Sequence, residues 1–263
     1  MYPVTVTQGE SPLVLAFPHT GTFVPDEIRA LMNDEGRLLR DTDWHVDALY
    51  RDLAPGVSTV AANFHRYVID ANRDQSGVSL YPGQTTTGLV PLSTFDDAPI
   101  WETPPDAAEI EARRLSWHAV YHAALEAELA RVRAIHGVAI LYDCHSIRSE
   151  CPWLFEGVLP DFNIGTDGGT TCAPEIEAAV LRRCEGSGRS TVLNGRFRGG
   201  WTTRHYGRPE TGIHAIQMEL AQSSHLATET PPFGLDPSKA AQIRAVLTPI
   251  LADLIDLAPS LVR

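Results

Sequence analysis

Short apolar runs rich in β-branched residues alternate along the chain with longer stretches whose apolar positions recur at helical spacing. The short runs predict strands at 13–17, 56–62, 66–69, 138–142, 190–193 and 213–220. The longer stretches predict helices at 25–33, 41–53, 106–136, 173–184 and 238–258. Such alternation is typical of a layered α/β fold, and we expect residues 1–263 to form a single domain of this class.

The segment 82–105 departs from this pattern, because it is rich in Gly, Thr and Pro and shows no clear period. Loops longer than about 12–15 residues inside a compact domain usually carry function or are disordered. We therefore expect a long loop of one of these two kinds here.

Composition and charge narrow the function classes. The chain has 263 residues, of which 43% are hydrophobic and 21% charged, as in an ordinary globular protein with a large core. Its net charge of −12 repels a phosphate backbone, so generic nucleic-acid binding is not expected. No apolar run approaches the roughly 20 residues that span a bilayer, and the first residues lack the pattern of a secretory leader. We expect a cytoplasmic protein without a membrane segment, whose four cysteines are reduced thiols.

Polar residues with catalytic potential stand where the predicted strands end. These residues are His19, the pair Asn72-Arg73, His145 and Glu219. In open α/β sheets, ligands bind outside the carboxyl ends of the strands. A single histidine near an apolar strand is more often a hydrogen-bonded core residue, but two such histidines and a carboxylate together favour a site.

Two histidines and a carboxylate that leave one position open form a recurrent catalytic zinc site, in which a nearby glutamate acts as general base and acid. Candidate carboxylates lie in the segment 40–47, where Asp43 and Asp47 share a helix face. The alternative interpretation is that Asp41 and Asp43 stabilise a helix N-terminus through its dipole. The HExxH motif of zincins does not occur.

Serine and cysteine hydrolases are competing classes. The GxSxG motif of a nucleophile elbow is absent from the sequence, although a triad can still assemble in the fold. Cys144 adjoins His145, but neighbours in a strand point to opposite faces, which argues against a thiol–imidazole pair.

Arginines crowd around the predicted strand ends although the chain as a whole is acidic. They are Arg66, Arg73, Arg148, Arg196, Arg198 and Arg204. Taken singly, each would be assigned to the surface or to an ion pair. Together with Asn72, Asn194 and the glycines of segment 195–207, they look like an anion-binding loop. Because guanidinium groups match carboxylates bidentately, the sequence predicts a small dicarboxylate ligand.

Long and rare sequence segments, taken in order, cover most of the chain. They are FPHTGTFVP at 17–25, DTDWHVDALY at 41–50, RYVIDANR at 66–73, SLYPGQTTTGL at 79–89, DCHSIRS at 143–149, LFEGVLPDFNIGTDGGTTC at 154–172, NGRFRGGWTTRHYGRP at 194–209 and GIHAIQMELAQ at 212–222. On these segments the chain resembles the N-formylglutamate amidohydrolase family, also called N-formylglutamate deformylases.

The resemblance implies hydrolysis of N-formyl-L-glutamate to formate and L-glutamate, the last step of histidine degradation. It also implies a fold similar to zinc carboxypeptidases and aspartoacylase-like amidohydrolases, a three-layer α/β/α domain with a mixed sheet. By order and local context, His19 and His145 match the metal-ligating histidines of those relatives, and Asn72-Arg73 matches a pair that grips the substrate carboxylate. Glu219 matches the glutamate that takes the proton of the attacking water and returns it to the departing amine.

The third metal ligand departs from the relatives' pattern, because Thr22 stands where they have a glutamate. Asp43 is the first choice, since a carboxylate completes a two-histidine site without another neutral ligand. His45 is the reserve, and Asp47 ranks below both. We expect one divalent metal ion, with zinc as the default and manganese, iron or cobalt as alternatives.

The remaining expectations concern the substrate. Arg66 and Arg204 are expected to hold its carboxylates together with Asn72-Arg73, and His205 to donate a hydrogen bond. Two other functions stay open: a metal amidohydrolase for another N-acyl amino acid, such as an acetyl or succinyl derivative, and a non-catalytic dicarboxylate-binding protein that has kept the fold. The presence of Glu219 argues against mere binding, which needs no proton shuttle.

Overall fold

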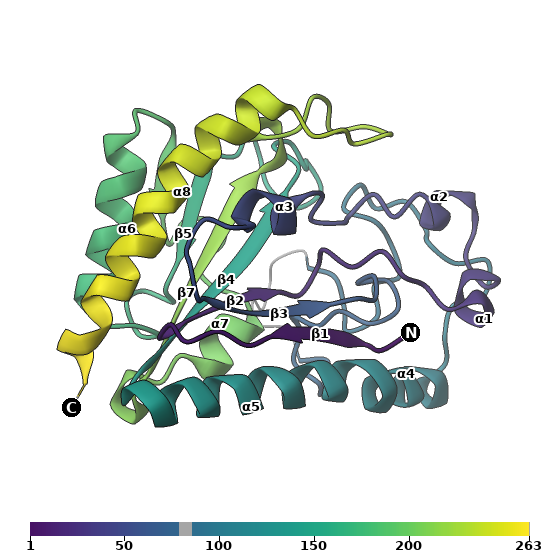
Figure 1. The fold of residues 1–263 in the computed structure, drawn as a ribbon. Coiled ribbons are helices and arrows are strands. Elements are labelled where there is room, and N and C mark those ends of the chain that lie inside the picture. Colours follow the sequence, from purple (N-terminus) through teal and green to yellow (C-terminus); the bar gives the residue numbers. More distant parts are fainter. Residues whose placement is uncertain (79–85, 263) are drawn as a thin grey trace.

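One mixed β-sheet forms the centre of the molecule (Figure 1). The computed structural model describes residues 1–78 and 86–262. The strands are β1 Val4–Thr7, β2 Leu13–Phe17, β3 Ser58–Ala62, β4 Ala139–Ile147, β5 Phe162–Gly165, β6 Thr191–Leu193 and β7 Ile213–Ala221, in the order β1-β3-β2-β4-β7-β5-β6. Strands β3, β2, β4 and β7 are parallel, whereas β1 and β5 pair antiparallel with β3 and β7. The carboxyl ends of the central strands therefore meet at one edge, where a ligand can contact several of them.

Helices cover both faces of this sheet. They are α1 Asp26–Arg29, α2 Asp34–Arg37, α3 Val46–Tyr50, α4 Ala107–Arg113, α5 Ala119–His136, α6 Pro174–Gly186, α7 Trp201–Tyr206 and α8 Pro237–Leu257. Helix α5 packs along one face, and α3, α6 and α8 lie on the other (Figure 1). The expected three-layer α/β/α arrangement with a mixed sheet is confirmed. Among the helices of the described residues, none is long and apolar enough to cross a membrane.

Strand β4 shows how the sheet separates two cores. Its residues Ile140, Tyr142 and Cys144 pack into the core beneath α6 and α8. Ala139 and Leu141 pack into the core beneath α5. Because side chains alternate between the faces of a strand, a sheet covered on both sides needs a continuous apolar run, and residues 139–142 of β4 provide one.

The predicted strand at 66–69 is wrong, because residues 66–68 form a turn. The backbone N–H of Val68 donates to the carbonyl oxygen of His65 at 2.9 Å, so the chain folds back on itself. The apolar side chains of this segment are nevertheless buried in the core beneath α5. Their apolar character therefore indicates burial and not an extended backbone.

Several predicted boundaries also move. The helix expected at 41–53 is reduced to α3, because His45 adopts a left-handed φ of 62° directly before it. The strand expected at 138–142 continues to Ile147, which places His145 inside β4. The hydrophobic pattern does not predict β1, β5 or α7. Residues 86–105 of the expected loop have irregular backbone apart from isolated bridges, and its residues 82–85 lie outside the described part of the chain.

Candidate metal centre and catalytic pocket

Strands β4 and β7 lie side by side and carry polar side chains in register. Asp143 is opposite Gln217, and His145 is opposite Glu219. All of these side chains are buried and share the sheet face that is turned toward α5 and α7. Cys144 lies on the other face, in the core beneath α6 and α8, so strand alternation separates it from His145 as expected.

Two imidazole rings and one carboxylate converge at the edge of the sheet. His19 follows β2, Asp43 precedes α3, and His145 comes from β4. Asp43 Oδ2 lies 3.8 Å from His19 Nδ1 and 3.2 Å from His145 Nδ1, and the two ring centroids are 4.9 Å apart. One ligand atom from each side chain lies within 4.8 Å of the others, and all three residues are buried. This donor set of two nitrogens and one oxygen suits zinc and other first-row divalent ions.

A further carboxylate faces the far nitrogen of each ring. His19 Nε2 lies 2.7 Å from Asp70 Oδ1, and His145 Nε2 lies 3.0 Å from Asp143 Oδ1. A carboxylate oxygen only accepts, so Asp70 favours the His19 tautomer that carries its proton on Nε2 and leaves the Nδ1 lone pair for a metal ion. The Nε2 of His145 also lies 3.1 Å from Asn72 Nδ2. Metal-ligating histidines are commonly oriented by such carboxylates. The residues present therefore fit a metal ion.

Burial and neighbouring charges shift the pKa values of this cluster. Burial and the charge of Arg66 lower the pKa of His19. Burial would also lower the pKa of His145, but the carboxylates of Asp143 and Asp43 outweigh it and raise this pKa well above its usual value. For Asp43, burial is outweighed by the two histidines, which lower its pKa. Buried carboxylates thus surround the two rings, an electrostatic environment that favours a cation.

Glu219 occupies the position next to His145 with little access to water. Its Oε2 accepts a hydrogen bond from Gln217 Nε2 at 2.9 Å, and Gln217 Oε1 accepts one from the backbone N–H of Gly200 at 2.6 Å. Burial raises the pKa of Glu219 to about 8, while the charge of His145 opposes this rise. A carboxyl group whose pKa lies near neutrality can both accept and return a proton.

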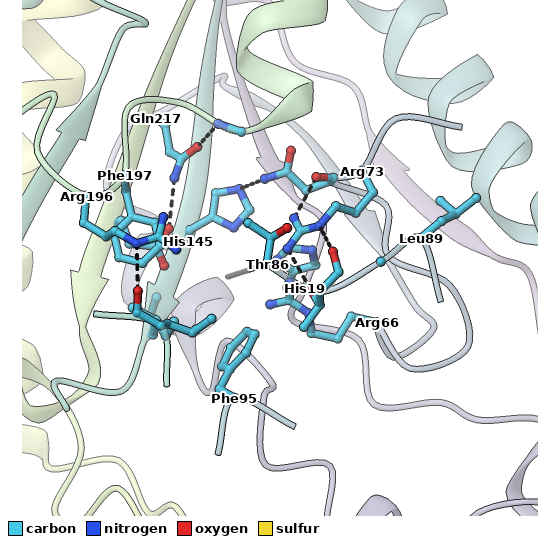
Figure 2. Close-up of a pocket in the computed structure, with 18 of the residues that line it drawn as sticks. His19, Arg66, Arg73, Thr86, Leu89, Phe95, His145, Arg196, Phe197 and Gln217 are labelled. Atoms are coloured by element: carbon cyan, nitrogen blue, oxygen red, sulfur yellow. Dashed lines mark hydrogen bonds between the residues drawn. The ribbon is translucent and has the colours of Figure 1, made fainter. Parts of the chain in front are cut away.

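A cavity of about 310 Å³ lies beside these groups (Figure 2). Its lining includes His19, Arg66, Asn72, Arg73, Phe95, His145, Arg196, Phe197 and Glu219. In the view of Figure 2, His145 lies between Arg196 on one side and Arg73 on the other. A small anionic molecule in this cavity would contact cationic side chains and the candidate metal centre at the same time.

The arginines of the cavity are held by specific partners. Arg66 Nη2 lies 2.6 Å from Asp70 Oδ2, and Arg73 Nη1 lies 3.7 Å from the same oxygen. Arg196 donates from Nε to the carbonyl oxygen of Leu154 at 3.1 Å, and its guanidinium carbon lies 5.3 Å from the ring centroid of Phe197. The guanidinium carbon of Arg66 lies 4.8 Å from the ring centroid of Phe95. Arg66 Nε is buried and has no hydrogen-bond partner among the described residues. Such a donor is a suitable contact for a substrate oxygen.

The structure does not bring Arg204 and His205 into this cavity, contrary to the expectation. Arg204 donates from Nε to the carbonyl oxygen of Gly199 at 2.8 Å and forms an ion pair with Asp167 at 3.2 Å. His205 is exposed and stacks on Trp201 with ring centroids 4.2 Å apart. Within the expected anion-binding loop at 195–207, residues 201–206 form α7 and carry these two side chains, whereas the irregular residues 195–200 contribute Arg196 to the lining.

The alternatives for the third ligand lie elsewhere as well. His45 Nε2 lies 2.9 Å from the carbonyl oxygen of Phe233, and Asp47 is largely exposed beside Arg51. Asp43 is the carboxylate that faces both candidate histidines.

Sequence reasoning missed three residues of this site: Asp70, Asp143 and Gln217. It placed Arg196 in the predicted anion-binding loop but did not select it as a substrate contact. The signal for Asp143 was present, because it precedes His145 by two positions on the same strand face. Gln217 stands in the same relation to Glu219.

The mixed sheet, the buried histidine–carboxylate centre and the adjoining glutamate define the class of protein, a hydrolytic enzyme with an α/β fold. The chain belongs to the N-formylglutamate amidohydrolase family, whose model matches residues 11–226.

Relatives support this family. The N-formylglutamate deformylases of Pseudomonas aeruginosa and Pseudomonas putida are 44% and 45% identical to the chain over 254 and 255 residues, and each alignment covers 94% of both proteins. The crystal structure of N-formylglutamate amidohydrolase from Ralstonia eutropha JMP134 is 26% identical, has a TM-score of 0.85 and covers 99% of both chains. A crystal structure from Agrobacterium tumefaciens, 18% identical with a TM-score of 0.74, shares the fold.

Proposed function

We propose that this chain, acting as a single catalytic domain, hydrolyses N-formyl-L-glutamate to formate and L-glutamate with one divalent metal ion, zinc by default. The observation that carries the proposal is the buried group His19, Asp43 and His145 beside Glu219 in an arginine-lined cavity. Family membership and the names of the relatives agree with this substrate. The reaction belongs to histidine degradation.

His19 and His145 would hold the ion through Nδ1, and Asp43 through Oδ2. Such an ion polarises a carbonyl group and makes water a stronger nucleophile at neutral pH. Asp70 and Asp143 would keep the two rings oriented through their Nε2 atoms.

Glu219 moves the proton. As water forms a bond to the formyl carbon, Glu219 accepts a proton from it, and the C–N bond then breaks as Glu219 gives this proton to the departing nitrogen. The products are formate and the free amine of L-glutamate. The pKa of about 8 places Glu219 close to the pH at which both transfers are efficient.

The arginines of the cavity hold the two carboxylates of the substrate. Arg73 and Arg196 lie on different sides of His145 (Figure 2), and Arg66 lines the same cavity. Guanidinium groups bind carboxylates through paired hydrogen bonds, so a dicarboxylate is favoured over an N-formyl amino acid with an apolar side chain. Arg196 takes the place that sequence reasoning gave to Arg204.

A formate-release assay with N-formyl-L-glutamate tests the function directly. We expect turnover by the metal-loaded protein, loss of turnover after chelation and recovery when a divalent ion is restored. Faster turnover of N-acetyl- or N-succinylglutamate would reassign the substrate, and binding without formate release would favour a non-catalytic role. Full activity of rigorously metal-free protein would contradict the metal centre.

A further inference from the structure

Helices α4 and α5 are joined by a π-helical turn, Arg114–His118, beneath the sheet (Figure 1). In an α-helix of 3.6 residues per turn, positions five apart diverge by about 140° around the axis. In a π-helical turn, whose hydrogen bonds join residues five apart, such positions lie nearly above one another. The turn therefore brings Arg113 onto the same helix face as His118 and His122.

These three side chains approach three carbonyl oxygens of one irregular segment, residues 68–73. Arg113 Nη1 donates to Val68 O at 3.3 Å. His122 Nε2 lies 2.8 Å from the carbonyl oxygen of Ala71, and His118 Nε2 lies 3.0 Å from that of Arg73. The segment belongs to neither a helix nor a named strand, so side chains take over the role that regular backbone pairing has elsewhere.

The chemistry of both rings is set by these contacts. A carbonyl oxygen only accepts, so each ring donates its Nε2–H. In His122, Nδ1 is then the acceptor for the hydroxyl of Tyr206 at 3.0 Å. Burial lowers the pKa of both histidines, that of His122 to about 3, so neutral rings with one N–H each are the relevant forms.

The segment carries two residues of the cavity. Asn72 Oδ1 accepts from the backbone N–H of Thr202 at 2.9 Å, and its Nδ2 lies 3.1 Å from His145 Nε2. The side chain of Arg73 lines the cavity, and the backbone carbonyl oxygen of Arg73 faces His118. Neither His118 nor His122 is among the described residues that line the cavity. Their hydrogen bonds to the carbonyl oxygens of Ala71 and Arg73 connect them to the segment that carries Asn72 and Arg73.

We propose that Arg113, His118 and His122 form a hydrogen-bonding clamp that positions Asn72 and Arg73 for substrate binding. They are positioning residues and touch no reacting atom. The identity of the substrate rests on the proposed function, whereas the positioning of Asn72 and Arg73 rests on the contacts of segment 68–73.

The test compares His118→Leu, which removes the donor, with His118→Gln, whose amide can replace Nε2–H. We expect His118→Leu to raise the KM for N-formyl-L-glutamate about 3–10-fold, the value of one neutral hydrogen bond, with kcat and bound metal nearly unchanged. His118→Gln should restore the wild-type KM. His118→Asn, polar but too short to reach the carbonyl oxygen, should behave like His118→Leu and serves if the leucine variant does not fold. His136→Leu, at the far end of α5, is the matched control and should leave KM unchanged.

Hydrogen–deuterium exchange supplies a readout that needs no substrate. Peptides covering 68–73 should exchange faster in His118→Leu and His118→Asn than in the wild type, while peptides of α8 should not change. If the wild type does not hydrolyse N-formyl-L-glutamate, the proposed function is wrong. The exchange comparison still tests whether the clamp holds segment 68–73. Wild-type exchange and KM in the variants lacking the donor would overturn the clamp, as would a glutamine variant as impaired as the leucine variant.

Discussion

At the residue scale, Glu219 combines burial with a position next to His145. Glu219→Gln keeps the size of the side chain and much of its hydrogen bonding but removes the group that accepts a proton. We expect kcat to fall by about 10²–10⁴-fold, with metal content and substrate affinity retained. Formate release and metal analysis on the same sample measure this. Glu210→Gln, an exposed control, should keep full activity, and near-normal kcat in Glu219→Gln would remove Glu219 from the mechanism.

His122 should make the protein acid-sensitive. Burial lowers its pKa to about 3 in the folded chain, below the ordinary value of 6.5. Between pH 3 and pH 6.5 the imidazole binds a proton in the unfolded chain but not in the folded chain. The free energy of unfolding is therefore unaffected by this residue above pH 6.5 and decreases as the pH falls below it. At pH 4 the loss amounts to about 3 kcal/mol relative to pH 8.

Urea unfolding of the wild type and of His122→Gln at both pH values measures this loss, because other titrating groups cancel in the difference. Between pH 8 and pH 4 the wild type should lose about 3 kcal/mol more unfolding free energy than His122→Gln. A difference independent of pH would show that His122 titrates normally in the folded protein.

At the element scale, Gly200 at the start of α7 packs closely against the side chain of Asn72. A Cβ atom at Gly200 would lie 2.3 Å from Asn72 Nδ2 and 2.6 Å from its Oδ1, so Gly200→Ala must displace this side chain. Since a shift of about 1 Å in a positioned group can cost 10²-fold in rate, we expect kcat/KM to fall about 10–100-fold. In the control, Gly186→Ala at the end of α6, the new Cβ meets nothing within 4 Å, and activity should stay unchanged. Equal kinetics in the two variants would contradict the role of this contact.

At the scale of the whole molecule, the candidate metal centre links segments that are far apart in the sequence. His19 follows β2, Asp43 lies before α3, and His145 comes from β4. An ion bound only to the folded chain at 100 times its dissociation constant adds about 2.7 kcal/mol to stability. For a chain of this length that corresponds to a rise in Tm of roughly 5–10 °C.

Thermal unfolding with and without zinc measures this rise, and chelator should reverse it. His145→Ala should lose most of the shift because it removes one ligand. A full shift in that variant would place the ion elsewhere.

Much of this site could be predicted from local sequence alone. Strand periodicity placed His19 and His145 near the ends of buried strands, and a carboxylate near two histidines already indicated metal chemistry. Alternation along a strand is enough to place Cys144 and His145 on opposite faces of the sheet. These inferences succeed because side-chain chemistry and strand periodicity are local properties of the chain.

Tertiary packing decided the rest. Arg196 lines the cavity whereas Arg204 does not. Arg204 lies in the helical segment 201–206, and its side chain pairs with Asp167. The choice of Asp43 over His45 depends on contacts with residues about 100 positions away in the sequence. The π-helical turn that aligns His118 with segment 68–73 has no periodic signature. Sequence by itself determined which chemical groups are available and which of them are buried, and the packing of distant segments determined which groups meet, because those distances depend on all the intervening elements together.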